Sequence, residues 1–362
     1  MNAFNDNISQ DEASQNIDNH DSKEEILWED DDNDLIAACE EWESSTNKTV
    51  AVQSLLHPLT QIRSGYLWVS DLCSQMWCEQ QFEYKLTAPT KEPETEHMAK
   101  GTELHLAREL ETQDYVDVKI TSDEDIFAVK VINLTHALIG FVQGSIPVSR
   151  EVPIFGTLGD SDTFFLGKID EINTYGDNSS LQIVEFKTRI SNSLPGKSQK
   201  KTHEIQVMAY KSLICNLIHD GLKPEKVYST LNLNGKKSLG KDVLSHCKTG
   251  LNEDRVVSCL DDLINILNNA AKFLSVNVTM KINYTSQKDG KCFAEEIVID
   301  NETWFLSQID ALLRYWNGEK KTEGVDIEDA WKCQNCHYAD ECTWRKAKAE
   351  DLAKKNQKKI TL

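Results

Sequence analysis

Two apolar segments with charged residues in their interiors, residues 163–172 and 181–188, constrain the fold more than any other feature of the sequence. Their hydrophobic pattern has a period near two, which is typical of β-strands. The linking residues 175–180 are turn-forming, so the pair is predicted to be an antiparallel hairpin. If the hairpin turns at the midpoint of this link, Asp170 lies directly opposite Glu185.

The charged residues of this hairpin suit metal-assisted chemistry. Glu185 and Lys187 share one face of their strand, because strand side chains alternate. Two opposed carboxylates would lie roughly 5 Å apart and repel each other. A hard cation such as Mg²⁺ or Mn²⁺ would remove the repulsion, polarise a phosphoryl oxygen and activate a water held by Lys187. Asp170, Glu185 and Lys187 therefore predict phosphodiester hydrolysis, with an ordinary solvated strand face as the alternative.

Ten cysteines are the second unusual feature. The first residues lack the basic and apolar regions of a secretory signal, so we expect reduced thiols rather than a disulfide framework. Cys333, Cys336 and Cys342 form a C-x₂-C-x₅-C cluster, and Cys73 or Cys78 could supply a fourth ligand. Four thiolates suit either structural Zn²⁺ or an iron–sulfur cluster, and the spacing does not separate the two. The other alternative is that the three clustered cysteines are buried without a metal.

The remaining hydrophobic pattern predicts the order of elements. Helices are predicted from Ser70 or Asp71 through Tyr84 and over residues 98–111, 126–142, 203–218, 254–274 and 302–316. Further strands are predicted over residues 151–158, 227–233 and 292–299. Helices followed by a cluster of strands and then by mixed elements indicate an α/β fold, with a mixed central sheet flanked by helices.

The formal charge of −20 would by itself argue against a nucleic-acid partner. Its distribution changes that conclusion. Residues 1–50 hold fifteen acidic residues and two lysines, which predicts a disordered acidic tail. From Arg345 onward, seven basic residues face two acidic ones, and the loop 189–201 is basic without an acidic residue. We therefore expect a nucleic-acid strand to enter beside this loop. No apolar run is long enough to predict a membrane span.

Four short motifs occur in the order seen in one nuclease group: Gly101…His105, Gly167…Asp170, Glu185-Phe-Lys187 and Gln206…Tyr210. Together they resemble the RecB-like branch of the PD-(D/E)XK nuclease superfamily. The resemblance implies that His105, Asp170, Glu185 and the carbonyl of Phe186 bind Mg²⁺ or Mn²⁺, and that Lys187 orients the attacking water. It also implies that Gln206 and Tyr210 support the site and the nucleic-acid backbone.

The cysteines resemble one family within that group. Trp77-Cys78-Glu79, with Cys333, Cys336 and Cys342, is similar to the split cysteine arrangement of the eukaryotic exonuclease V family. The resemblance covers roughly residues 54–346 and implies an iron–sulfur nuclease domain, with a four-iron four-sulfur cluster on Cys78 and the three later cysteines. Residues 347–362 would then be a basic C-terminal tail.

The same resemblance implies an activity. We expect a metal-dependent exonuclease that acts on single-stranded DNA in repair or replication, mainly 5′ to 3′, and releases short oligonucleotides. The alternatives are a non-catalytic zinc-containing nucleic-acid-binding or scaffold protein, and a nuclease directed at RNA. We expect a monomer without membrane attachment, whose acidic tail contacts a single-strand-binding protein or another repair partner. The acidic start and the Lys354-Lys355 and Lys358-Lys359 pairs favour the nucleus, with the mitochondrion or cytoplasm as alternatives.

Overall fold

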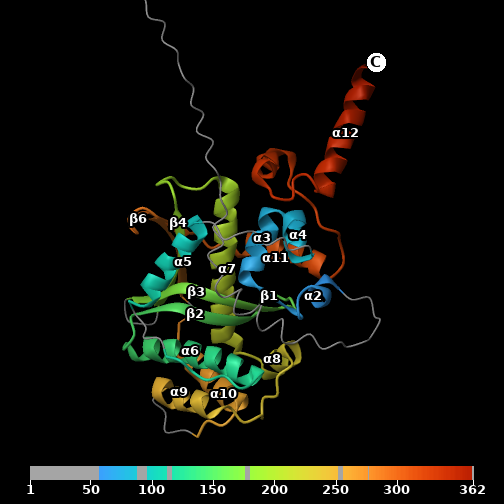
Figure 1. The fold of residues 1–362 in the computed structure, drawn as a ribbon. Coiled ribbons are helices and arrows are strands. Elements are labelled where there is room, and N and C mark those ends of the chain that lie inside the picture. The colour runs from blue at the N-terminus through green and yellow to red at the C-terminus, as the bar shows by residue number, and fades with distance from the viewer. Residues whose placement is uncertain are drawn as a thin grey trace, which may run out of the picture.

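The fold is built on a mixed β-sheet (Figure 1). A computed structural model describes residues 57–87, 96–111, 116–175, 180–251, 256–275 and 277–360. Six strands form the sheet in the order β1-β3-β4-β5-β6, and β2 also pairs with β3. The β1–β3 and β4–β5 pairs are parallel and the others antiparallel. The strands are β1 (Tyr66–Trp68), β2 (Val148–Thr157), β3 (Phe164–Tyr175), β4 (Ser180–Arg189), β5 (Val278–Ser286) and β6 (Cys292–Val298).

Helices flank this sheet, which confirms the predicted α/β architecture. They are α2 (Pro58–Gln61), α3 (Val69–Trp77), α4 (Glu79–Thr87), α5 (Glu96–Glu109), α6 (Asp123–Gln143), α7 (Lys197–Asp220), α8 (Pro224–Leu231), α9 (Lys241–Leu251), α10 (Leu260–Ala271), α11 (Glu302–Trp316), the 3₁₀ helix η1 (Ile327–Asn335) and α12 (Thr343–Ile360). The long helix α7 contacts β2, β4 and β5. In Figure 1, α6, α9 and α10 form a layer at one side of the sheet, while α12 extends away from the rest.

The β3–β4 hairpin has the predicted register. Glu171 pairs with Val184 and Tyr175 with Ser180, as a turn at the midpoint of the link requires. The turn residues 176–179 lie outside the described residues. The ladder stops at Glu171, and beyond it Oδ2 of Asp170 accepts a hydrogen bond of 2.7 Å from the backbone amide of Phe186. The carboxylate thus takes the place of a carbonyl acceptor where the two strands separate.

Among the described helices, α6 is long and apolar enough to cross a membrane by length and composition. Here it packs against β2, α9 and α10. Its side chains Val131, Leu134 and Phe141 are fully buried in the core. Length and composition alone also fit the core helix of a folded domain, and these contacts are those of a core helix.

Three predicted elements are corrected by the structure. The strand predicted over residues 227–233 is wrong: Pro224 begins helix α8, and Val227 and Leu231 are buried at helical spacing. The early helix is interrupted at Cys78, whose φ of −160° is extended, so α3 and α4 are separate. Helix α10 begins at Leu260, because the carboxylate of Asp262 accepts hydrogen bonds from the amides before it. The sequence analysis also missed β5.

The early and late parts of the chain meet through a polar contact between α3 and α11. The side-chain amide of Gln75 donates to the carbonyl of Leu312 at 2.9 Å and to Glu79 at 2.7 Å. The indole of Trp316 donates to the side-chain oxygen of Gln75 at 2.8 Å. All four groups in this α3–α11 lock are satisfied inside the protein, which fixes the position of the helices that lead into Cys78.

Candidate active site and cysteine cavity

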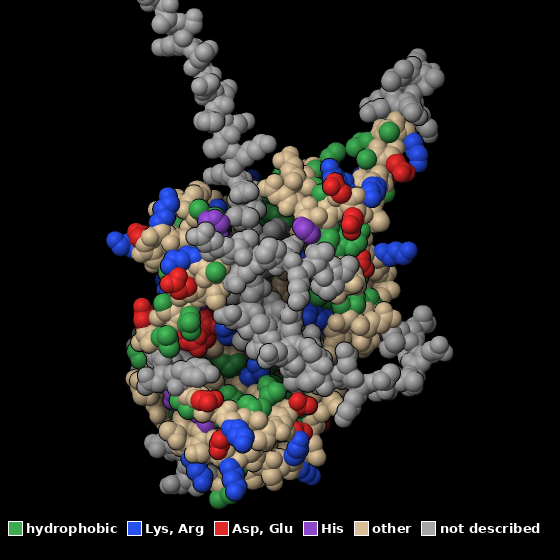
Figure 2. All heavy atoms as spheres, in the orientation of Figure 1, with side chains coloured by type: hydrophobic (Ala, Val, Ile, Leu, Met, Phe, Trp, Pro, Cys, Tyr) green, Lys and Arg blue, Asp and Glu red, His purple; other side chains and the backbone are tan. Residues whose placement is uncertain are grey.

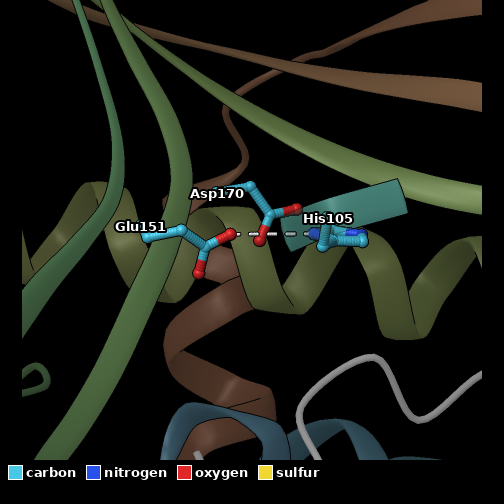
Figure 3. A group of neighbouring side chains, drawn as sticks. All are labelled: His105, Glu151 and Asp170. Carbon is cyan, nitrogen blue, oxygen red and sulfur yellow. Dashed lines mark ion pairs between the residues drawn. The ribbon is translucent and has the colours of Figure 1, made fainter. Parts of the chain in front are cut away.

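His105, Glu151 and Asp170 form a cluster suited to a metal ion (Figure 3). They come from α5, β2 and β3, and one nitrogen or oxygen from each lies within 4.8 Å of the others. Nδ1 of His105 is 3.7 Å from Oε1 of Glu151. Solvent reaches only 14% of the His105 side chain and 9% of the Glu151 side chain. Carboxylate oxygens suit Mg²⁺ or Mn²⁺, and the neutral imidazole of His105 offers a nitrogen donor beside them.

Glu151 was missed by the sequence analysis, which placed it at the start of a strand without a role. Its neighbours Arg150 and Val152 pair with Glu171 and Ile169, so Glu151 stands opposite Asp170 in register. Its φ of 51° is left-handed, which is uncommon for a residue with a side chain and is often found at functional sites. The signal was available: a β2–β3 hairpin centred between Asp160 and Ser161 pairs residues 151 and 170.

Burial and charge oppose each other at the two carboxyls. Burial raises the pKa of Asp170 to about 6; the charge of Glu151 also raises it, and the charges of His105 and Lys187 lower it. Burial also acts to raise the pKa of Glu151, but a hydrogen bond from His105 and the charge of Lys168 outweigh it and leave this pKa below its usual value. Glu151 is therefore ionised at neutral pH, while Asp170 loses its proton near pH 6.

The predicted pair on β4 also lies at this end of the sheet. Nζ of Lys187 is 3.0 Å from Oε1 of Glu185, and solvent reaches 2% of the Glu185 side chain and 10% of the Lys187 side chain. The shared strand face is therefore confirmed. Of the four predicted metal ligands, His105 and Asp170 fall within the 4.8 Å group and Glu185 lies outside it. The Phe186 amide contacts Asp170, and the role of the Phe186 carbonyl stays a prediction.

Gln206 and Tyr210 lie one turn apart on α7, where the amide of Gln206 donates to the Tyr210 hydroxyl at 3.2 Å. Both are buried, with 4% and 2% exposure. The Tyr210 ring lies against Gly167, where an added Cβ would be 2.8 Å from a ring carbon. Glycine at this position therefore lets α7 pack closely under β3, near Asp170. This placement suits support of the site, and contact with a nucleic-acid backbone stays a prediction.

A network of ion pairs holds α5 against the sheet. Nε of Arg150 is 2.8 Å from Glu171, its Nη1 is 2.7 Å from Glu111 just after α5, and Nη1 also donates to the carbonyl of Arg108 within α5. The guanidinium of Arg108 lies 3.2 Å from the centre of the Phe186 ring. These contacts tie α5 to β2, β3 and β4, which brings His105 to the two carboxylates.

The basic loop that follows β4 is partly ordered by its own contacts. Arg189 donates to the carbonyl of Ser193 at 3.2 Å and to the side chain of Gln199 at 3.1 Å, and Lys200 forms an ion pair with Glu296 of β6. Figure 2 shows lysines and arginines interspersed with acidic side chains over the described part of this face, rather than a patch of one sign. Strand entry beside the loop therefore stays a prediction.

The four predicted cluster cysteines, Cys78, Cys333, Cys336 and Cys342, line one small cavity. Cys78 lies at the break between α3 and α4, and the others lie in η1 and the turn after it. Burial, together with the other three thiols, raises the pKa of Cys78 to about 11. Cys73 instead donates its thiol hydrogen to the carbonyl of Val69 within α3. The structure thus places Cys78 rather than Cys73 at this cavity.

Fold and site together define an α/β protein with a buried His–Glu–Asp cluster beside a Glu–Lys pair. The chain belongs to the exonuclease V family: the family described as "Exonuclease V - a 5′ deoxyribonuclease" matches residues 54–182, 173–262 and 249–345. This confirms the family that the motifs indicated. Exonuclease V of Danio rerio is 34% identical over 292 residues, which cover 80% of this chain and 73% of the relative.

Two solved structures share lower similarity. The crystal structure of SSO0001 is 12% identical, with a TM-score of 0.32 and coverage of 86% of this chain and 96% of its own. A protein assigned as an exonuclease from Eubacterium rectale is 11% identical, with a TM-score of 0.36. The match covers 77% of this chain and 91% of the Eubacterium rectale chain. Scores at this level carry no argument about the fold or the site.

Proposed function

We propose that the protein is a divalent-metal-dependent exonuclease that degrades single-stranded DNA from its 5′ end and releases short oligonucleotides. The observation that carries the proposal is the His105–Glu151–Asp170 cluster beside the Glu185–Lys187 pair, in a chain of a 5′ deoxyribonuclease family. An imidazole nitrogen and two carboxylates converge from three elements, close enough together to share one cation. When bound, Mg²⁺ or Mn²⁺ would polarise a phosphoryl oxygen and lower the pKa of a coordinated water.

The residues around the cation have two roles, metal binding and positioning of the attacking water. His105, Glu151 and Asp170 hold it, with Glu185 and the Phe186 carbonyl as further ligands by resemblance. Asp170 loses its proton near pH 6, so the full set of charged ligands is present at neutral pH. Lys187, positioned by its contact with Glu185, would orient the attacking water by resemblance to the nuclease motifs.

One digestion series tests this function. End-labelled single- and double-stranded DNA and RNA are incubated with Mg²⁺ and either the wild type or Asp170→Ala. We expect short products from the 5′ end of single-stranded DNA with the wild type only. Asp162→Ala, a change at an almost fully exposed aspartate away from the cluster, is the control and should keep full activity. Full activity of Asp170→Ala would refute the site, and preferential cleavage of RNA would refute the substrate.

We also propose that Cys78, Cys333, Cys336 and Cys342 bind a four-iron four-sulfur cluster. The donor set fits, because four thiols meet at one cavity. The preference for an iron–sulfur cluster over zinc rests on the split arrangement of Cys78 and the three later cysteines, which resembles that of the exonuclease V family.

Metal analysis of protein purified without oxygen tests the cluster. We expect a coloured protein with about four irons per chain. Cys336→Ala should lose the visible absorbance and become less stable, because ligation energy contributes to folding. Cys73→Ala, outside the cavity, is the control and should keep the colour. A colourless wild type with one zinc per chain would overturn the cluster assignment.

The cellular role is proposed from the sequence and the family. We infer that the protein acts in DNA repair in the nucleus, where the acidic residues 1–50 contact a single-strand-binding protein or another repair factor. These residues lie outside the described part of the chain. Imaging of a tagged full-length chain after DNA damage, compared with a chain lacking residues 1–50, tests both statements. Exclusion of the full-length chain from the nucleus would refute the compartment.

A further inference from the structure

Lys168 is a charged residue at the site that the proposed chemistry leaves without a role. It lies on β3 two residues before Asp170, so both side chains leave the strand on the same face. Its ammonium forms an ion pair with Oε2 of Glu151. Solvent reaches 27% of the Lys168 side chain, against 10% for Lys187. Of these two lysines, Lys168 is the more accessible to a ligand from solvent.

The charge balance of the site calls for another cation. As carboxylates, Glu151, Asp170 and Glu185 carry three negative charges, and a metal-binding histidine is neutral. One divalent cation and Lys187 balance those three charges. The phosphodiester of a DNA strand adds a further negative charge. Arg150 pairs with Glu111 and Glu171. Arg108 lies over the Phe186 ring, and its charge is shared among Glu171, Asp170 and Glu111, so both arginines are already engaged with groups of the protein.

We propose that Lys168 is a substrate-contacting residue that changes partners during the reaction. Before a metal binds, its ammonium holds Glu151. Once a divalent cation shares the Glu151 carboxylate, the ammonium is released to contact a phosphate of the bound strand. The proposal rests on the metal-dependent DNA hydrolysis proposed above and adds a competition between Lys168 and the metal for one carboxylate.

The test compares Lys168→Met and Lys168→Arg with a matched control. Lys226→Met removes a lysine of similar exposure, 24%, that pairs with Asp162 away from the cluster. Mn²⁺ binding without DNA is measured by calorimetry. Loss of the competing ammonium should tighten Mn²⁺ binding by about two- to fivefold in Lys168→Met, the range expected for a partly exposed ion pair. The Lys226→Met control should bind Mn²⁺ as the wild type does.

DNA binding gives the second measurement. Affinity for a labelled single strand is measured in Ca²⁺ over a range of salt, with the strand checked to stay intact. Loss of one phosphate contact should lower the slope of log affinity against log salt by about 0.7. Lys168→Arg and Lys226→Met should keep the wild-type slope. If Lys168→Met fails to fold, Lys168→Gln, which can still donate to Glu151, takes its place.

The outcomes separate this proposal from the proposed function. A wild-type slope in the neutral variants, or weaker Mn²⁺ binding, would overturn the role of Lys168 while the wild type still binds metal and cleaves DNA. A wild type that neither binds Mn²⁺ nor cleaves DNA would instead overturn the function on which the proposal rests.

Discussion

Replacement of Asp170 by asparagine should stabilise the metal-free protein at neutral pH, although it should abolish cleavage. The carboxyl is buried, and its pKa rises from 3.8 to about 6 on folding. A shift of about two units corresponds to roughly 3 kcal/mol of differential stability between the two protonation states. Asparagine keeps an oxygen that can accept the hydrogen bond from the Phe186 amide, and it never takes on the buried charge.

The sign of the pH dependence follows from the raised pKa. The stability contributed by protonated Asp170 is fully present below pH 3.8 and is lost as the pH rises through about 6. The stability of Asp170→Asn minus that of the wild type should therefore be near zero at pH 4 and greatest above pH 7. For a chain of this size, about 3 kcal/mol corresponds to a rise of roughly 6 °C in the melting midpoint.

Melting in EDTA at several pH values between 4 and 8 measures this difference. Excess Mn²⁺ at pH 8, at 100 times its dissociation constant, should then stabilise the wild type by about 2.7 kcal/mol and raise its melting midpoint, and it should leave the variant almost unchanged. Asp162→Asn, at an exposed aspartate, is the control and should show no such dependence. A stability difference that is the same at pH 4 and pH 8, or a variant less stable at pH 8, would refute the reasoning.

Three further changes test the site and its support. Glu151→Gln should weaken Mn²⁺ binding at least about tenfold in calorimetry, and wild-type affinity would exclude Glu151 as a ligand. Gly167→Ala should lower the free energy of unfolding in urea by about 1–3 kcal/mol, because the new Cβ would lie 2.8 Å from the Tyr210 ring. Unchanged stability would contradict this close packing. Gln75→Ala should lower the free energy of unfolding by about 1–3 kcal/mol in the same assay, because it leaves the buried indole nitrogen of Trp316 without its acceptor. Unchanged stability would show that water replaces the Gln75 oxygen.

Hydrophobic spacing and turn position predicted the elements whose structure depends on neighbouring residues in the chain. The register of the β3–β4 hairpin followed from turn position alone, since Glu171 does face Val184. Helix α11 was predicted with its observed bounds, Glu302–Trp316, because its apolar residues keep helical spacing; the structure adds that Asn301 caps it. Residues 227–233 were misassigned because β-branched residues outweighed the Pro224 start signal, although Val227 and Leu231 have helical spacing.

The sequence predicted only those site residues that belong to a short motif or to the β3–β4 hairpin. His105 and Asp170 were named from motifs, and the structure brings them together. Glu151 belongs to no short motif, and its position depends on a second strand pairing and a left-handed backbone that residue type does not indicate. The contact between Lys168 and Glu151 was hidden for the same reason, because it joins two strands in space.

The α3–α11 lock has a consequence for how the protein is made. Gln75 lies 237 residues before Leu312 and 241 before Trp316, so a ribosome releases α3 long before its partners exist. Until then the polar groups of Gln75 and Glu79 cannot find their buried partners, and Leu72 and Trp77 lack much of their cover. Strands β1 to β4 can pair first, whereas the region around Cys78 must wait until α11 has been made. Newly made chains therefore pass through a state with this region open, and it is there that we expect chaperones to bind.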